Sequence, residues 1–126
     1  MSISEKDLPI YDWAVNLGSK LKVRRTDKST VANILELFQS IPDPKEAALL
    51  TMMYIARQIG RGEIYRDVGN LIIERLSELY NKFSQEPEKL KETTLKLLTL
   101  MKWAYESEFR NEIRDFNDFI SYIKRS

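Results

Sequence analysis

The sequence contains neither cysteine nor histidine. Without cysteine the chain has no disulfide, no thiolate metal site and no cysteine nucleophile. Without histidine it lacks the commonest proton shuttle and the commonest transition-metal ligand. The two absences remove most familiar enzyme chemistries, and we expect neither a cofactor nor a catalytic residue.

Glycine and proline are scarce, at four residues each in 126, and no apolar run approaches the roughly 20 residues that span a bilayer. The first residues, Met1 to Asp7, do not resemble a secretory signal. The formal net charge is only +1, so the whole chain does not indicate a polyanion partner. We therefore expect a cytoplasmic protein without membrane association.

Apolar residues recur at spacings of three and four along most of the chain, which is the pattern of amphipathic helices. No segment alternates convincingly with period two, and no internal repeat is present. The sequence predicts a single compact all-α bundle of five to six helices over residues 1–126, with 1–8 frayed and a linker near 84–87. The predicted helices cover approximately 9–25, 30–40, 44–60, 65–83, 87–108 and 114 onward.

The third of these helices has the clearest start, because Asp43 can cap it, Pro44 suits its first position and Glu46 its third. Two large aromatic residues, Trp13 and Trp103, fall within apolar stripes. Their position predicts that both pack in the core instead of stacking on a ligand.

Tyr54, Arg57, Gln58 and Arg61 are spaced i, i+3, i+4 and i+7, so they share one helical face. Arginine offers paired donors to phosphate and aromatic rings stack on bases, which makes this face a candidate RNA-binding surface. A second interpretation places Tyr54 in the core and pairs both arginines with carboxylates of a neighbouring helix. The sequence leaves both interpretations open.

The most basic segment runs from Lys20 to Lys28, where Asp27 is the only acidic residue. It can follow a nucleic-acid strand electrostatically, or it can be a solvated helix end whose cations lie near the negative end of the helix dipole. The candidate contacts in this segment are Lys20, Lys22, Arg24 and Arg25.

Carboxylates also occur in pairs at helical spacing, but Lys or Arg lies close to each pair, as on a solvated face. A bundle that binds two iron ions also needs histidine, and no phosphate-binding loop or nucleophile elbow is present. We therefore predict no metal site and no enzymatic activity. The pairs are Glu74/Glu78, Glu88/Glu92 and Asp115/Asp118.

The order of these features resembles the small helical subunit of type III CRISPR effector complexes, the Csm-type family. The resembling segments cover about 100 residues, and their motifs are short. The family often has a Gln-x-Arg group in its Thr/Ser-rich helix, whereas residues 29–33 here read Ser-Thr-Val-Ala-Asn. This departure weakens the case for an RNA contact from that helix. The resembling segments are Thr26 to Phe38, Tyr54 to Gly62, Tyr65 to Tyr105, and Asp115 to Phe119 before Tyr122.

The resemblance implies a non-catalytic subunit for antiviral defence. Several copies would associate head to tail inside a ribonucleoprotein complex, beside guide RNA, target RNA and the other subunits. Contacts to RNA would be to the backbone, because any guide sequence must be accepted. Cleavage would belong to other subunits.

Three alternatives remain. A helical protein-interaction adaptor without nucleic-acid binding is suggested by the near-zero net charge and by Phe116, Phe119 and Tyr122. A helix-turn-helix DNA-binding protein is less favoured, because Pro42 and Pro44 make a poor tight turn and the following helix begins acidic. A metal-dependent nuclease is the remaining enzyme interpretation.

Overall fold

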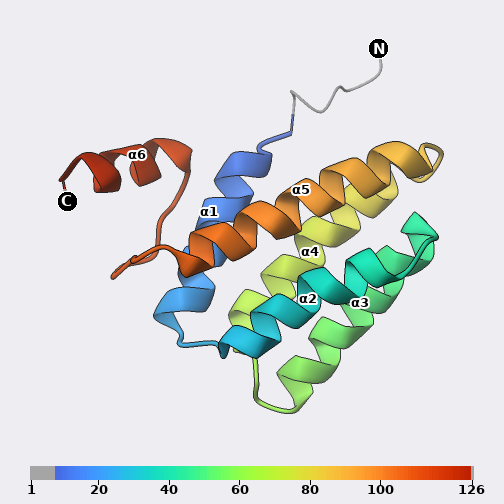
Figure 1. Cartoon of the computed structure of the whole chain (residues 1–126), viewed down its shortest axis with the longest axis horizontal. Helices are drawn as coiled ribbons and strands as arrows, with labels where there is room; N and C mark the ends of the chain where they lie inside the picture. Colours follow the sequence, from blue (N-terminus) through green and yellow to red (C-terminus); the bar gives the residue numbers. More distant parts are fainter. Residues whose placement is uncertain (1–7, 126) are drawn as a thin grey trace.

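The computed structural model describes residues 8–125, and within that range the chain forms six helices and no strand. The prediction of an all-helical bundle is thus confirmed. The expected fraying of 1–8 falls almost wholly on residues outside the described range. In chain order the helices are α1 (Ile10–Val23), α2 (Lys28–Ser40), α3 (Pro44–Gly60), α4 (Arg66–Lys82), α5 (Pro87–Glu106) and α6 (Phe116–Arg125) (Figure 1).

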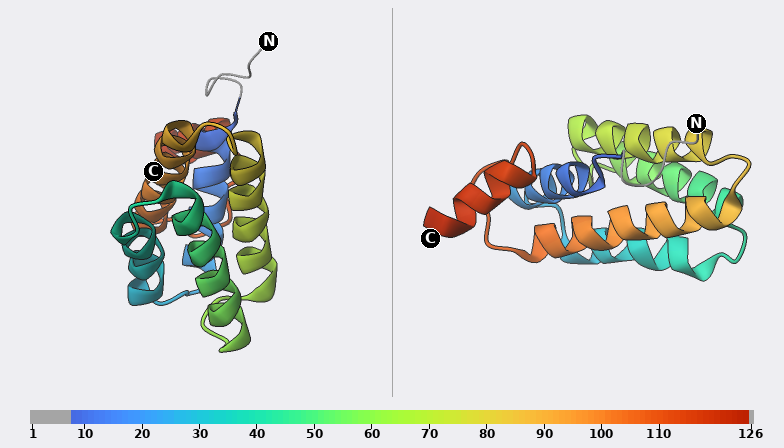
Figure 2. Two further views of the ribbon diagram at one scale, coloured as in Figure 1. Left: turned by 90° about the vertical axis from the view of Figure 1, so that its right-hand side faces the viewer. Right: turned by 90° about the horizontal axis from the view of Figure 1, so that it is seen from above.

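Helices α1 and α5 pack along each other over the most extensive contact in the molecule, and α2, α3 and α4 complete the bundle around them. Figure 2 shows these five helices side by side, with α6 projecting at one end. α6 contacts mainly α1. The end of α1, the start of α2 and the end of α5 meet at one end of the bundle (Figure 1).

Gly18 allows α1 and α5 to approach closely. A Cβ atom at this position would lie 2.5 Å from Ala104 Cβ and 2.5 Å from the backbone oxygen of Met101. It would also lie 2.9 Å from the backbone nitrogen of Tyr105. Two of these three atoms belong to the backbone, so the helices themselves would have to separate to admit a side chain.

The apolar stripes read from the sequence form one main core and a smaller cluster beside α6. The main core takes fully buried side chains from α1 to α5, including Leu17, Ile34, Ile55, Ile72 and Leu97. The smaller cluster consists of Val15, Ala104, Phe109 and Ile113, against which Phe116, Phe119 and Tyr122 pack.

The prediction for Trp103 is wrong, because 61% of this side chain is exposed. Met101, Ala104 and Tyr105 face inward on α5, and Trp103 lies two residues from Met101, about 200° around the helix. Trp13 is half-buried against the main core, with the Arg75 guanidinium 4.8 Å from its ring centroid.

The starts of α3 and α5 match the predicted bounds at residues 44 and 87. α3 begins as expected at Pro44, because the Asp43 carboxylate accepts a hydrogen bond from the Glu46 backbone N–H at 3.0 Å. α2 begins two residues earlier than expected, at Lys28, with Asp27 as its N-cap residue.

Among the described residues, no helix is both long and apolar enough to cross a membrane.

Candidate functional site

An open polar hollow of about 440 Å³ lies between the start of α2 and the end of α3. All four residues of the predicted α3 face line it, together with residues of α2 that the sequence did not single out as ligand contacts. The lining residues are Asp27, Ser29, Thr30, Asn33, Tyr54, Arg57, Gln58, Arg61 and Glu63.

The end of α3 positions Arg61 beside the helical residues of the face. Arg61 is the C-cap of α3, and its backbone N–H donates to the Arg57 carbonyl at 3.0 Å. Gly62 follows with φ of 76°, a left-handed conformation that favours glycine. The turn closes when the Glu63 N–H donates to the Gln58 carbonyl at 2.9 Å, which brings Glu63 to the rim of the hollow.

Arg57 and Arg61 are exposed, and neither forms an ion pair with any residue of 8–125. The alternative in which both pair with carboxylates of a neighbouring helix is therefore not what the structure shows. Their guanidinium donors face solvent at the edge of the hollow, where an anion can reach them.

Gln58 differs from its neighbours because it is only 6% exposed while lining the hollow. Its side-chain Oε1 is buried and accepts no hydrogen bond from the described part of the chain. A buried acceptor without a donor costs about 1–3 kcal/mol.

The α2 side of the hollow combines a carboxylate with the first turn of a helix. Asp27 is the N-cap of α2, but its side chain accepts from the Ser29 hydroxyl at 2.7 Å instead of from a first-turn N–H. The first-turn N–H groups of α2 are therefore not capped by Asp27, and such groups attract anions. With Asp27 and Glu63 lining it beside Arg57 and Arg61, the hollow offers both acceptors and cationic donors.

The loop before α2 is fixed by a tight turn at the end of α1. The Arg25 N–H donates to the Lys22 carbonyl and the Thr26 N–H to the Leu21 carbonyl, both at 3.0 Å, which is the Schellman pattern. Glycine is the usual residue at its left-handed position, yet Arg25 occupies it with φ of 59°. An arginine is thus held at a strained backbone position next to the hollow.

Tyr105 of α5 stabilises the same loop, because its hydroxyl donates a hydrogen bond to the Thr26 carbonyl at 2.5 Å. Burial raises the pKa of Tyr105 above its ordinary value of 10.0, and the negative charges of Asp27 and Glu106 raise it further. The Lys22 ammonium lies 5.5 Å from the ring centroid. Because the Tyr105 hydroxyl must keep its proton to donate to the Thr26 carbonyl, the fold requires the neutral form of this side chain.

We expect Tyr105→Phe to lower the free energy of unfolding at pH 7 by about 1–2 kcal/mol, because the Thr26 carbonyl loses its donor. As the pH rises above about 10, the unfolded chain releases the Tyr105 proton first, so wild-type stability falls. Tyr105→Phe has no such proton to release, so its free energy of unfolding lacks this contribution to the decrease at high pH. Urea denaturation at pH 7 to 11 measures both effects, with exposed Tyr11→Phe as the control. Equal pH dependence in Tyr105→Phe and wild type would contradict the assignment.

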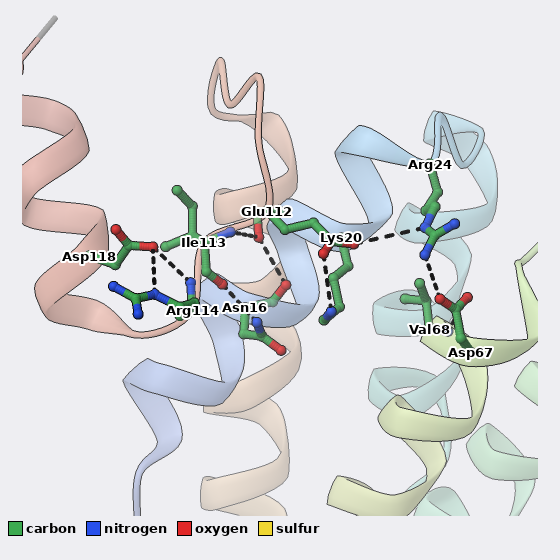
Figure 3. A network of polar contacts seen from close by, with 10 residues as sticks. Asn16, Lys20, Arg24, Asp67, Val68, Glu112, Ile113, Arg114 and Asp118 are labelled. Carbon is green, nitrogen blue, oxygen red and sulfur yellow. Dashed lines mark hydrogen bonds and ion pairs between the residues drawn. The ribbon is translucent and has the colours of Figure 1, made fainter.

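Lys20 and Arg24 belong to a structural network at the α1 end (Figure 3). Arg24 Nη2 lies 2.6 Å from Asp67 Oδ2 and its Nε lies 3.9 Å from Glu112 Oε1, while Lys20 Nζ lies 3.4 Å from Glu112 Oε2. The Arg24 guanidinium also lies 5.4 Å from the ring centroid of Tyr65. The structure therefore places neither cation in the α2–α3 hollow.

Lys22 lies at a second hollow of about 780 Å³, between α6 and the chain after α5. Three cations line it, Lys22, Arg110 and Arg125, against one carboxylate, Glu108. The basic segment is thus divided. Lys20 and Arg24 are ion-paired, Lys22 lines the second hollow, and Arg25 lies exposed in the turn before α2.

The aromatic residues of α6 form part of the chain's own packing. Phe109 lies 5.7 Å from Phe119 and 5.4 Å from Tyr122 between ring centroids, both edge to face. The preceding segment is bound to α1 through the Ile113 backbone, which accepts from Asn16 and donates to Ser19, each at 2.7 Å (Figure 3). Phe109 is buried, and the rings of Phe119 and Tyr122 are half-buried within the protein.

The carboxylate pairs have structural partners in two of three cases. Glu78 lies 3.4 Å from Arg75, and Asp115 caps the start of α6 by accepting from the Asp118 N–H at 2.8 Å. Between Leu8 and Arg125, no group of three or more acidic residues is arranged to hold a metal ion.

No protein family, no curated protein and no solved structure matches the chain. The fold and the site define an all-helical bundle with a mixed-charge polar hollow.

Proposed function

We propose that the chain is a non-catalytic small subunit of a cytoplasmic type III CRISPR ribonucleoprotein complex that makes sequence-independent contacts to guide and target RNA. The observation that carries the proposal is the α2–α3 hollow, where Arg57 and Arg61 stand without an ion-pair partner among residues 8–125. Two guanidiniums one turn apart suit phosphates of a strand. Contacts to phosphates do not require a pocket that recognises particular bases.

Two further exposed cations lie outside the α2–α3 hollow. Arg25 is exposed in the turn just before α2, and the second hollow adds Lys22 beside α6. Lys20 and Arg24 are not part of this surface, because they form ion pairs with Asp67 of α4 and with Glu112 in the segment before α6. Tyr54 packs partly against the core and lines the hollow with the rest of its surface.

Head-to-tail association of copies needs two different surfaces, and exposed apolar side chains supply candidates on separate helices. One group lies on α3, where Leu49, Leu50 and Met53 are 46%, 43% and 69% exposed. The other lies on α6, where Ile120 and Ile123 are 39% and 51% exposed. The same exposed groups favour the second candidate, a protein adaptor that binds no RNA.

We expect the purified chain, or the complex containing it, to bind single-stranded RNAs of unrelated sequence with similar affinity. Binding should weaken as salt increases, with a slope of about −0.7 in log K against log salt for each phosphate neutralised. Filter binding from 50 to 300 mM salt measures both properties. Binding that is absent both in isolation and in the complex leaves the adaptor as the better function.

A further inference from the structure

We infer that Tyr65, in the loop between α3 and α4 beside the α2–α3 hollow, is a stacking platform for an unpaired base of single-stranded RNA. The inference rests on the proposed RNA contact and deepens it, because it adds a contact to a base where the hollow offers contacts to phosphates. Stacking keeps the binding independent of sequence, since every base has a flat aromatic face.

The Tyr65 ring stands outside the core of the protein. The residue is 58% exposed, and it belongs to neither apolar cluster of the described residues. It occupies the N-cap position of α4, where Ser, Thr, Asp and Asn are preferred, and its side chain forms no cap hydrogen bond. The ring therefore serves neither the core nor the start of α4, and a ligand can reach it.

Arg24 orients the Tyr65 ring. Its guanidinium lies over the ring, 5.4 Å from the centroid, and its Nη2 lies 2.6 Å from Oδ2 of Asp67 in the first turn of α4. Because Asp67 fixes the guanidinium over one face, the ring is oriented before a ligand arrives, which lowers the cost of ordering it. The opposite face of the ring is left for a base, and an arginine beside the stack adds a cation–π contribution.

The loop between α3 and α4 places the ring next to the hollow. Ile64 is 2% exposed and anchors this loop in the main core, where its N–H donates to the Gln58 carbonyl at 3.3 Å. Its two neighbours, Glu63 and Tyr65, are exposed, and Glu63 lines the hollow. Four residues of chain span at most about 14 Å, so the Cα atom of Tyr65 lies within that distance of the Cα atom of Arg61. A strand whose phosphate meets Arg61 can therefore place a nearby base on Tyr65.

The test measures, by fluorescence anisotropy, binding of the full chain to oligouridylate and to a ribose–phosphate strand of equal length that carries no bases. The two strands have the same number of phosphates, so a difference in affinity reports contacts to bases. We expect the wild type to bind oligouridylate about tenfold more tightly than the strand without bases, the effect of one stacked base. Tyr65→Ala should bind both strands with the affinity that the wild type has for the strand without bases. Tyr65→Phe keeps the aromatic face and should keep the preference.

Tyr11→Ala is the matched control. Tyr11 is 48% exposed and also has a cation over its ring, with Lys96 Nζ 5.1 Å from the centroid. It lies in the first turn of α1, whereas Arg24 is the C-cap of that helix, about 20 Å away along the axis. We expect Tyr11→Ala to keep the wild-type preference for the strand with bases.

Equal wild-type affinity for the two strands overturns the inference and leaves the proposed function intact, because phosphate contacts alone then account for binding. Tyr65→Ala that keeps the preference, or that loses affinity for both strands equally, also overturns it. So does Tyr65→Phe that loses the preference, because a hydroxyl contact would then replace stacking. Loss of the preference in Tyr11→Ala overturns it as well, since the preference would not belong to Tyr65. Failure of the wild type to bind either strand overturns the proposed function itself.

Discussion

Arg57→Glu combined with Arg61→Glu weakens binding of single-stranded RNA at least about tenfold and reduces the salt slope by about 1 to 2. Each arginine is exposed and lacks an ion-pair partner within residues 8–125, so reversal changes the charge of the hollow without breaking a structural contact. Asp27 and Glu63 would then face two further carboxylates. In the double variant, an RNA strand would therefore meet a hollow lined by negative charges only, instead of one with charges of both signs.

The matched control is Lys82→Glu with Lys91→Glu, which changes the net charge by the same amount. Both lysines are exposed, and they lie near the α4–α5 connection, at the far end of the bundle from the hollow (Figure 1). We expect this control to keep most of the affinity. Equal losses in the two double variants would show that binding follows net charge alone, and the α2–α3 hollow would then have no special role.

Gly18→Ala should have the largest effect on stability. Alanine normally stabilises a helix interior relative to glycine by about 1 kcal/mol. Here the added Cβ would meet the backbone of α5 at 2.5 Å and 2.9 Å, so α1 and α5 must separate along the main core. We expect a net loss of about 3 kcal/mol and a lower Tm by roughly 10 °C.

Gly60→Ala is the control for this substitution, because nothing lies within 4 Å of a Cβ at Gly60. It should leave stability unchanged or raise it slightly. Adding Ala104→Gly to Gly18→Ala should recover only part of the loss, since that change removes one of the three close contacts and the other two involve backbone atoms. Full wild-type stability of Gly18→Ala in thermal denaturation would contradict the close approach of the helices.

The fold could be predicted from the sequence because its signals are local. Asp43, Pro44 and Glu46 fix the start of α3 within four residues, and the apolar spacings fix which sides face the core. Trp103 shows the limit of this reasoning. It stands in an apolar run, but the side of α5 that it occupies is decided by which helices pack there.

The candidate site could be predicted only in part. The spacing of Tyr54, Arg57, Gln58 and Arg61 places them on one face, and the structure brings all four into one hollow. The α2 residues opposite them depend on how two helices cross, which no local pattern contains. The burial of Gln58 without a donor is likewise a tertiary property.

The basic segment shows the same limit for electrostatics. The ion pair between Arg24 and Asp67 joins residues 43 apart, and that between Lys20 and Glu112 joins residues 92 apart. A run of cations in the sequence therefore could not show which members have structural partners. Of the four candidate contacts in that run, Arg25 at a strained turn is the closest in sequence to the residues that line the α2–α3 hollow.

The most direct test of the account is to purify the chain from its native cell under mild salt and to sequence the RNA that accompanies it. The account predicts short RNAs that share a repeat-derived end and differ in the remaining sequence, together with other protein subunits. They should be lost when Arg57→Glu and Arg61→Glu are combined in a complex that still assembles. Purification of the intact assembly without any RNA would contradict an RNA-contacting subunit.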